Sequence, residues 1–276
     1  MILIAQLTDL HLRPRGLPAL RVVETATMVR RAVARVLALD PRPDAVVITG
    51  DIADTPDPRE YELARDLLSP LPMPVYAVPG NHDSSEALRT AFADAAWAHQ
   101  SAAGSLQFAV DVGPVRLVGL DTNVPDETHG FLGAERLDFA RNALAAAPDR
   151  PTLMALHHPP IPSGMKDMDA IGLRDADALA ALVRANPQVG LVVAGHVHRP
   201  YVAPFGGAVG IVAPSVCHQT VLNLSGRGKP LFAFEPPAFL LHAWSAETGF
   251  ISHTIYVEDA AGPYDYSRAS GVLWPD

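Results

Sequence analysis

Two histidines separated by one residue follow a run of apolar residues, in the stretch Gly195-His196-Val197-His198. The run 189–194 is typical of a strand buried on both faces, and Gly195 allows a sharp turn where the strand meets a loop. Neutral imidazoles are good ligands for transition metals. Two hydrogen-bonded histidines at a strand end would give the same pattern, so this pair alone leaves both interpretations open.

Four further polar clusters also follow apolar runs. They are Asp9 with His11, Gly50-Asp51, Gly80-Asn81-His82-Asp83, and His157-His158. Each has an ordinary explanation as a turn, a cap or a buried histidine, but five such clusters in series favour a shared site. A hydrolytic centre with two metal ions needs a bridging carboxylate, further ligands for each ion and an open position for water. Mixed carboxylate, amide and imidazole ligands suit Fe, Mn, Zn or Co better than a structural zinc site, which would use thiolates.

Strands and helices alternate along the first 200 residues. Polar clusters at strand ends of an α/β sheet lie on one edge, where such folds place their sites. The apolar runs predict strands at 2–7, 44–49, 75–78, 115–120, 152–156 and 189–194. Helical spacing and breakers predict helices at 21–39, 58–68, 133–147 and 175–185, and one after Ser84 or Ser85.

The character of the chain changes after Tyr201. Strands are predicted at 209–213, 239–244 and 250–257 without helices between them. The stretch 223–237 is punctuated by glycine and proline and predicts a loop or hairpin that covers the site. We therefore expect a core at 1–200 that carries the site, and C-terminal strands at 201–276 that complete a second sheet. A lid or oligomerisation hairpin is expected at about 220–240 within them.

Composition excludes several classes of protein. The 276 residues suit one large α/β domain, and 49% of them are hydrophobic, which is enough for a full core. No apolar stretch reaches transmembrane length. A formal net charge of -9 argues against a nucleic-acid polymer or an anionic membrane as a partner. The single Cys217 excludes an intrachain disulfide, and the N-terminus lacks the features of a signal peptide. These features predict a cytoplasmic protein.

The set of motifs resembles the calcineurin-like binuclear metallophosphoesterases. Within that family the chain looks most similar to the class III phosphodiesterase branch, which includes glycerophosphodiesterases and cyclic-nucleotide phosphodiesterases. The resemblance implies an α/β fold, a four-layer α/β/β/α sandwich. It rests on Asp9-Leu-His11, Gly50-Asp-Ile-Ala-Asp54, Gly80-Asn-His-Asp83, His157 in His-His-Pro-Pro, Gly195-His-Val-His198, the tail Arg13-Pro-Arg15-Gly16 and the late Ala261-Gly-Pro-Tyr-Asp265.

The resemblance also implies a role for each matching residue. Asp9, His11 and His198 correspond to ligands of a first metal ion, Asp51 to the bridging carboxylate, and Asn81, His157 and His196 to ligands of a second. His82 then faces the substrate phosphate, Asp83 fixes its orientation, and His218 matches a histidine on the substrate side. Asp54 and His158 are expected to be structural or supporting residues. The remaining histidines match no motif and are expected at the surface or in the core: His99, His129, His242 and His253.

The expected function is that of a metal-dependent phosphodiesterase acting on small diesters, glycerophosphodiesters or 3′,5′-cyclic nucleotides, through attack of a metal-bound hydroxide on phosphorus. A phosphomonoesterase or a pyrophosphate hydrolase of the same fold is an alternative. A metal-binding scaffold without catalysis is another, but no ligand of the set is missing. The partner is a small-molecule phosphodiester, and a homo-oligomer, a dimer or higher, is expected. Pocket walls are expected from 13–20, from 161–173 and from the chain after Tyr201.

Overall fold

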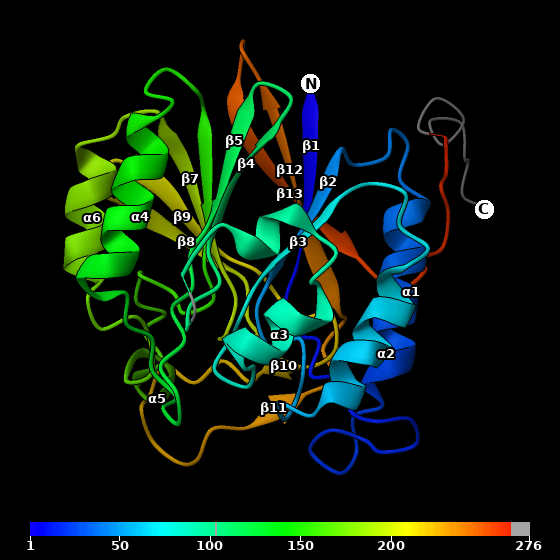
Figure 1. Ribbon diagram of the computed structural model, residues 1–276. Coiled ribbons are helices and arrows are strands. Elements are labelled where there is room, and N and C mark those ends of the chain that lie inside the picture. The colour runs from blue at the N-terminus through cyan, green and yellow to red at the C-terminus, as the bar shows by residue number, and fades with distance from the viewer. Residues whose placement is uncertain (103, 266–276) are drawn as a thin grey trace, which may run out of the picture.

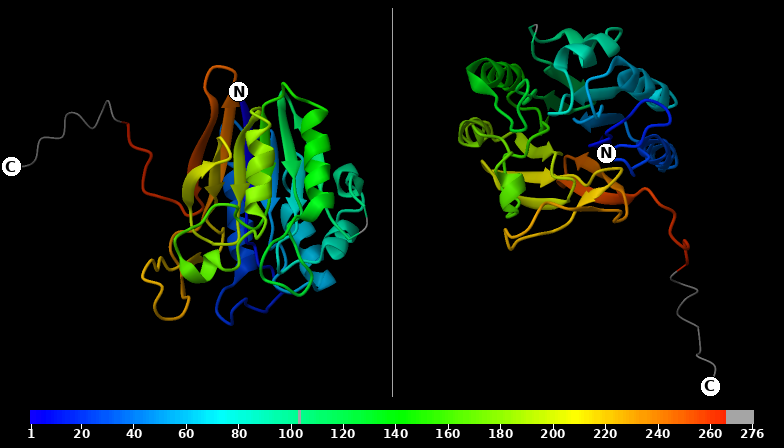
Figure 2. Two further views of the ribbon diagram at one scale, coloured as in Figure 1. Left: turned by 90° about the vertical axis from the view of Figure 1, so that its left-hand side faces the viewer. Right: turned by 90° about the horizontal axis from the view of Figure 1, so that it is seen from below.

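The computed structural model describes residues 1–102 and 104–265, which form two packed β-sheets with helices on the outer face of each. Figure 1 shows α1 (Thr25–Leu37) and α2 (Pro58–Leu68) on one side of the sheets, and α4 (Gly133–Ala145) and α6 (Ala176–Arg184) on the other. The two further views in Figure 2 show the same layering. The expected four-layer α/β/β/α sandwich is therefore confirmed. Residues 266–276, the end of the expected C-terminal region, lie outside the described residues.

The first sheet has five strands. Their order is β13 (Gly249–Tyr256), β12 (Ala238–Ser245), β1 (Ile2–Leu7), β2 (Ala45–Thr49) and β3 (Val75–Val78). β1, β2 and β3 are parallel to one another, and helices α1 and α2 connect them. β12 pairs antiparallel with β1, so that Ile2 lies opposite Trp244.

The second sheet has six strands. Their order is β4 (Phe108–Val112), β5 (Val115–Gly119), β6 (Thr152–Ala155), β7 (Val189–Ala194), β9 (Ala208–Val212) and β8 (Tyr201–Phe205). β5, β6, β7 and β9 are parallel, and the two edge strands are antiparallel to their neighbours.

The C-terminal strands are divided between the two sheets. β8 and β9 complete the six-stranded sheet, whereas β12 and β13 extend the five-stranded sheet beside β1. This differs from the expectation that all of them complete one second sheet. The physical reason is that β1 would otherwise leave an edge unpaired, and the apolar β12 covers it with a buried antiparallel partner.

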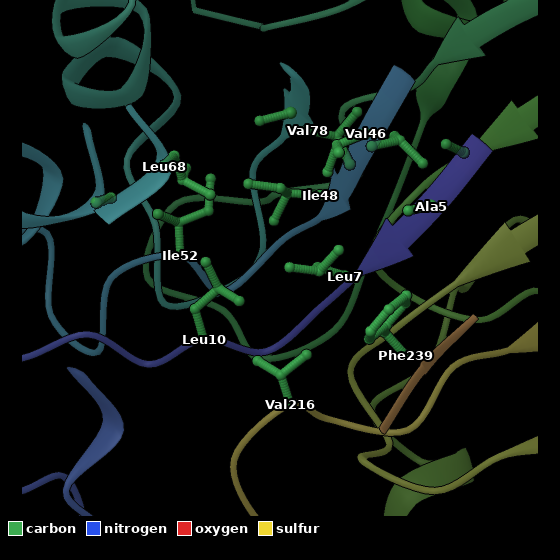
Figure 3. Packing of buried hydrophobic residues seen from close by; sticks show 14 of the residues in the cluster. Ala5, Leu7, Leu10, Val46, Ile48, Ile52, Leu68, Val78, Val216 and Phe239 are labelled. Atoms are coloured by element: carbon green, nitrogen blue, oxygen red, sulfur yellow. The ribbon is translucent and has the colours of Figure 1, made fainter. Parts of the chain in front are cut away.

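Side chains that alternate along the strands build the two cores. Leu117 and Leu153 belong to the core between the sheets, whereas their neighbours Val118 and Met154 pack with the residues of α4 and α6. Figure 3 shows the first core, where Leu10 and Ile52 continue the apolar packing just beyond the ends of β1 and β2. The loops that follow these strands are therefore anchored by buried side chains, and their polar residues are held in place.

Short elements complete the edge of the sheets where the parallel strands end. α3 (Ser85–Ala91) begins after Ser84, whose Oγ accepts from the main-chain N of Ala87 at 3.2 Å. The hairpin of β10 (Gln219–Thr220) and β11 (Phe232–Ala233) lies at this edge, at the bottom of Figure 1. η1 (Ala96–His99) and α5 (Lys166–Asp169) are the other short helices. Within the described chain, none of the helices has the length and apolarity needed to cross a bilayer.

Candidate metal centre

The polar clusters of both sheets meet at one edge, and many of their residues have an unusual backbone conformation. Asp9, His11, Asp51, His196 and His198 all have positive φ angles, between 43° and 69°. Such left-handed conformations are rare for residues other than glycine and cost of order 1–3 kcal/mol each. They persist only where the surroundings enforce them, which is typical of functional sites.

Two glycines allow the clusters to approach each other. A Cβ atom on Gly80 would overlap Oδ1 of Asp51 and lie 2.8 Å from its Cγ. A Cβ atom on Gly50, which has a φ of +91°, would lie 2.6 Å from Cγ of His157. Glycine is therefore required at both positions for Asp51 and His157 to occupy the same site.

The first cluster brings together Asp9, His11, Asp51 and His198, all of which are buried. Nε2 of His11 lies 3.1 Å from Nε2 of His198 and 3.5 Å from Oδ2 of Asp51. Nε2 of His198 lies 3.3 Å from Oδ1 of Asp9. Two ring nitrogens and two carboxylates therefore face one small volume.

The second cluster shares Asp51 with the first but uses its other oxygen. Nε2 of His157 lies 3.4 Å from Oδ1 of Asp51, 3.2 Å from Oδ1 of Asn81 and 3.3 Å from Nδ1 of His196. Because Oδ1 faces His157 and Oδ2 faces His11, the carboxylate of Asp51 presents one oxygen to the imidazoles of each cluster.

The hydrogen bonds made by the Nδ1 atoms of three histidines determine that their Nε2 atoms are the ones available to bind a metal ion. In His11, His157 and His198, Nδ1 faces an oxygen that can only accept, so Nδ1 carries a proton and each ring, when neutral, presents the lone pair of Nε2. Lone pairs that face each other and two carboxylates require a cation between them, so both clusters fit a metal ion. The three contacts are His11 to Oδ1 of Asp54 at 3.2 Å, His157 to the carbonyl of Thr49 at 2.7 Å, and His198 to the carbonyl of His218 at 3.1 Å.

The charges of the clusters are strongly coupled. Burial alone would raise the pKa of Asp51, but the imidazoles of His157 and His11 hold it well below its usual value. The same balance, dominated by His198, lowers the pKa of Asp9 to about 2. Burial lowers the pKa of His157, yet Asp51 outweighs it and raises that pKa to about 9. Without a cation, a proton therefore occupies the position between His157 and Asp51.

His82 and Asp83 are neighbours in sequence but have different surroundings, and the His82 ring lies 4.7 Å from that of His11 in the first cluster, measured between centroids. The exposed His82 ring donates from Nδ1 to the carbonyl of Asp54 at 2.8 Å. Asp83 is buried, and its carboxylate accepts from the main-chain nitrogens of Gly80, Ile52 and Ala53 at 2.9–3.1 Å. The expected contact of the Asp83 carboxylate with His82 is therefore corrected: this carboxylate joins two loops instead, and the Asp54 carbonyl orients the ring.

His218 also lies against the first cluster, with its ring 5.7 Å from that of His11. Its buried ring is 4.5 Å from that of His198 and 5.3 Å from that of Phe232 in β11, measured between centroids. Burial, together with the neighbouring His198, lowers the pKa of His218 to about 3, so this imidazole is neutral. His158 is also fully buried, with its ring 4.7 Å from that of His196.

The four unmatched histidines lie outside both clusters. His99 and His253 are exposed, His129 pairs with Glu127 at 3.2 Å, and His242 is buried beside Gln6. The sequence interpretation missed Thr49 and Tyr61. Thr49 acts through its main-chain oxygen, which carries no sequence signal, and Tyr61 in α2 donates to Asp83 at 3.2 Å. Tyr61 is part of an amphipathic helix, where an aromatic residue is indistinguishable from ordinary core.

An open cleft of about 540 Å³ adjoins the second cluster. Asn81 and His82 form its inner wall, and residues from the loops after β2, β3 and β5 form the remainder. Among these are Asp54, Ser84, Asn123, Asp126 and Glu127. A small ligand in this cleft would contact His82 and lie beside the shared carboxylate.

Comparisons with known proteins agree with this geometry. The family profile of the calcineurin-like phosphoesterases matches residues 2–200. A probable glycerophosphodiester phosphodiesterase GpdQ from Arcobacter nitrofigilis is 32% identical over 273 residues, covering 99% of both chains. The 3′,5′-cyclic adenosine monophosphate phosphodiesterase CpdA of Pseudomonas aeruginosa is 34% identical over 218 residues, covering 79% of this chain and 77% of that protein.

Solved structures show the same fold at low sequence identity. A dimetal phosphatase from Danio rerio superposes with a TM-score of 0.61 at 16% identity, covering 93% of this chain and 99% of that one. The purple acid phosphatase PPD1 from yellow lupin gives a TM-score of 0.63 at 13% identity, covering 92% of this chain and 53% of that one. With its two Asp and His clusters forming a binuclear metal centre, the chain belongs to the calcineurin-like phosphoesterase family.

Proposed function

We propose that the protein is a metal-dependent phosphodiesterase that hydrolyses small phosphodiesters, either glycerophosphodiesters or 3′,5′-cyclic nucleotides. The observation that carries the proposal is the position of Asp51, whose two oxygens face two separate clusters of metal ligands beside an open cleft. The names of the relatives at 32% and 34% identity support a diester as the substrate.

We assign the ligands by the atoms that converge. Asp9, His11 and His198 hold the first ion, and Asp51 bridges to the second. Asn81, His157 and His196 complete the second site, with donors that suit Fe, Mn, Zn or Co. When bound, the two ions supply positive charge for the phosphoryl oxygens and acidify a water nucleophile.

His82 is the residue of this chain placed to act on the substrate itself. Burial lowers the pKa of its imidazole, but the Asp51 carboxylate and the hydrogen bond to Asp54 outweigh burial and raise the pKa above its usual value. With Nδ1 fixed on the Asp54 carbonyl, Nε2 is left to donate a hydrogen bond to the phosphate or a proton to the leaving alkoxide.

His218 and Asp83 have supporting roles in this proposal. The neutral His218 ring is held between His198 and Phe232, where a substrate bound at the first cluster would contact it. Asp83 acts indirectly, because its carboxylate joins the loop that carries Asn81 and His82 to the loop that carries Asp51. His82 and His218 thus flank the centre, and Asp83 holds one of the flanking loops.

The region after Tyr201 borders the centre beside His218, outside the cleft described above. Phe232 in β11 contacts His218, and the connection between β10 and β11 exposes Leu222, Leu224 and Leu231. We propose that this hairpin is a separate region from the core at 1–200, that it contributes to substrate preference and that it helps to form a dimer or larger assembly. The single buried Cys217, which forms no disulfide, supports a cytoplasmic location.

The test is a turnover panel with and without metal. The substrates are bis(p-nitrophenyl) phosphate, p-nitrophenyl phosphate, cyclic AMP and glycerophosphodiesters. We expect kcat/KM for the preferred diester to exceed that for the monoester, chelation to abolish hydrolysis, and added metal to restore it. A preference for the monoester would overturn the diesterase assignment, and full activity after exhaustive chelation would overturn the metal-dependent mechanism.

A further inference from the structure

His196 has one ring nitrogen in the second cluster and one outside it. Its main-chain N donates to both carboxylate oxygens of Asp9 at 3.1 Å, and its Nδ1 lies 3.3 Å from Nε2 of His157. Its Nε2 is buried and has no hydrogen-bond partner within residues 1–102 and 104–265. When Nδ1 offers its lone pair to a cation, the proton of the neutral ring must be on Nε2, and this buried N–H needs an acceptor.

The neighbouring His158 also has a buried ring nitrogen without a hydrogen-bond partner. Its side chain is fully buried, its ring is tilted by 51° to that of His196 at 4.7 Å, and its Nε2 likewise lacks a partner in the described structure. One ring nitrogen from each of His157, His158 and His196 lies within 4.8 Å of the others. Two unsatisfied nitrogens on adjacent buried rings would satisfy each other if a small rotation of the rings brings them into hydrogen-bond contact and one donates while the other accepts.

The hydrogen bond at Nδ1 of His158 determines whether its Nε2 can donate or accept. Nδ1 lies 2.8 Å from Oγ1 of Thr122, and the same hydroxyl oxygen accepts from the main-chain N of His158 at 3.3 Å. If Nδ1 donates to Thr122, Nε2 becomes an acceptor. A Cβ atom on Gly130 would lie 2.6 Å from Cβ of His158, so the glycine leaves room for the ring to stay in this position.

We propose that His158 is a positioning residue that accepts the Nε2–H of His196 in the metal-loaded protein and so holds His196 in the tautomer with Nδ1 free for the second ion. The inference rests on the binuclear centre described above. A metal-bound imidazole is a stronger donor than a neutral one, so the cation itself favours this arrangement of protons. Metal-ligating histidines are generally supported in this way through their second nitrogen, and loss of the support typically costs 10–100-fold in metal affinity.

The test compares two substitutions that differ in where they place an acceptor. His158→Gln keeps an amide oxygen near the position of Nε2, whereas His158→Asn keeps a polar group only near Nδ1 and Thr122. Metal-free protein is titrated with Co²⁺, and the visible spectrum is recorded at saturation. We expect His158→Asn to bind the second equivalent about 10- to 100-fold more weakly, with the spectrum at saturation unchanged. His158→Gln should bind it nearly as tightly as the unmodified chain.

Three results would overturn the inference. If both variants bind Co²⁺ as the unmodified chain does, His158 is not the acceptor for His196. It then donates to another group, such as the nearby main chain of Thr128. If both lose the second equivalent and the spectrum at saturation changes, His158 is itself a ligand. If His158→Gln binds as weakly as His158→Asn with an unchanged spectrum, an acceptor at the Nε2 position is not what matters. Failure of the unmodified chain to bind two equivalents would instead contradict the metal centre.

Controls separate this role from general damage to the core. His242→Asn removes another buried histidine, which hydrogen-bonds to Ser252 and Gln6, and should leave Co²⁺ affinity unchanged. Melting temperatures of the metal-free variants report their folding. Should His158→Asn fail to fold, Thr122→Val is the substitute, because it removes the hydroxyl that selects the acceptor form of His158. It should likewise lower the affinity for the second equivalent of Co²⁺. Unchanged affinity in a folded Thr122→Val protein would overturn the proposed tautomer.

Discussion

Asp51 and His157 face each other across the two sheets, with Oδ1 of the carboxylate 3.4 Å from Nε2 of the imidazole. Asp51 follows β2 of the first sheet and His157 follows β6 of the second, so this contact closes the site between them. The other oxygen of Asp51 faces His11, which makes this carboxylate the common element of both clusters.

Asp51→Asn should therefore remove metal from both clusters, because a neutral amide is a poor bridge between two cations. Elemental analysis of the purified variant, together with hydrolysis of bis(p-nitrophenyl) phosphate, measures both effects. Asp54→Asn is the matched control, since the Asp54 carboxylate contacts Nδ1 of His11 and the guanidinium of Arg13 but does not lie between the two clusters. It should weaken metal binding by about 10–100-fold without changing the stoichiometry at saturation. Two tightly bound ions in Asp51→Asn would contradict the bridging assignment.

Metal affinity should rise with pH because a proton competes for the same position. Asp51 raises the pKa of His157 from 6.5 to about 9, against the effect of burial, so the metal-free site holds this proton below pH 9. A cation must displace it, and affinity should increase about tenfold per pH unit between pH 6 and 8. Titration of the metal-free protein with Co²⁺ at several pH values measures the slope. A flat profile over this range would show that His157 is already neutral.

Gly80→Ala should disrupt the centre without adding or removing any ligand. Its Cβ atom would overlap Oδ1 of Asp51, which has no free direction in which to move because its other oxygen faces His11. We expect metal affinity to fall by at least about tenfold, the scale of loss when a ligand's support is disturbed. Gly172→Ala is the control, because a Cβ there would meet only the carbonyl oxygens of Pro159 and Asp169, at 3.4 and 3.6 Å. Equal affinity in both variants would contradict the crowding argument.

His82→Ala should keep both ions and lose rate. A residue that acts as a general acid or stabilises charge typically contributes about 10²- to 10⁴-fold. The loss should be greater for diesters with poor leaving groups than for p-nitrophenyl esters, whose leaving group needs no proton. Metal content measured on the same preparation is the control, and a loss of bound metal would identify His82 as a ligand or structural residue.

Most strands could be predicted from the sequence because their apolar runs are buried on both faces. The predicted starts and ends of β1, β3 and α2 agree with the structure to the residue. β4 was not predicted, because its sequence Phe-Ala-Val-Asp-Val is only partly buried at the edge of a sheet. β8 is also an edge strand, and it contains Pro204, which argues against a strand from sequence alone.

The candidate ligands could be predicted because each motif places chemistry at a strand end, but their supporting contacts could not. Thr49 and His218 orient His157 and His198 through main-chain carbonyls, which any residue type would provide. The carboxylate of Asp83 turned out to join two loops because three main-chain N–H groups and Tyr61 converge on it. That convergence depends on how the loops fold against each other, which the motif does not encode.

The hairpin of β10 and β11 gives the last prediction, which concerns substrate preference. Phe232 lies edge-on to His218 with its centroid 5.3 Å away, and it is only 39% exposed, whereas its neighbour Leu231 is 64% exposed. Phe232→Ala should therefore open space beside His218 and change the ratio of kcat/KM between bulky and small diesters, while metal content stays the same. Leu231→Ala is the matched control and should leave the ratio unchanged.

Replacement of 223–237 by a short glycine linker should change the same ratio and lower the oligomeric mass measured by light scattering. If the mass and the ratio both stay constant in the shortened protein, the hairpin neither sets substrate preference nor joins protomers, and Phe232 serves only to pack against His218.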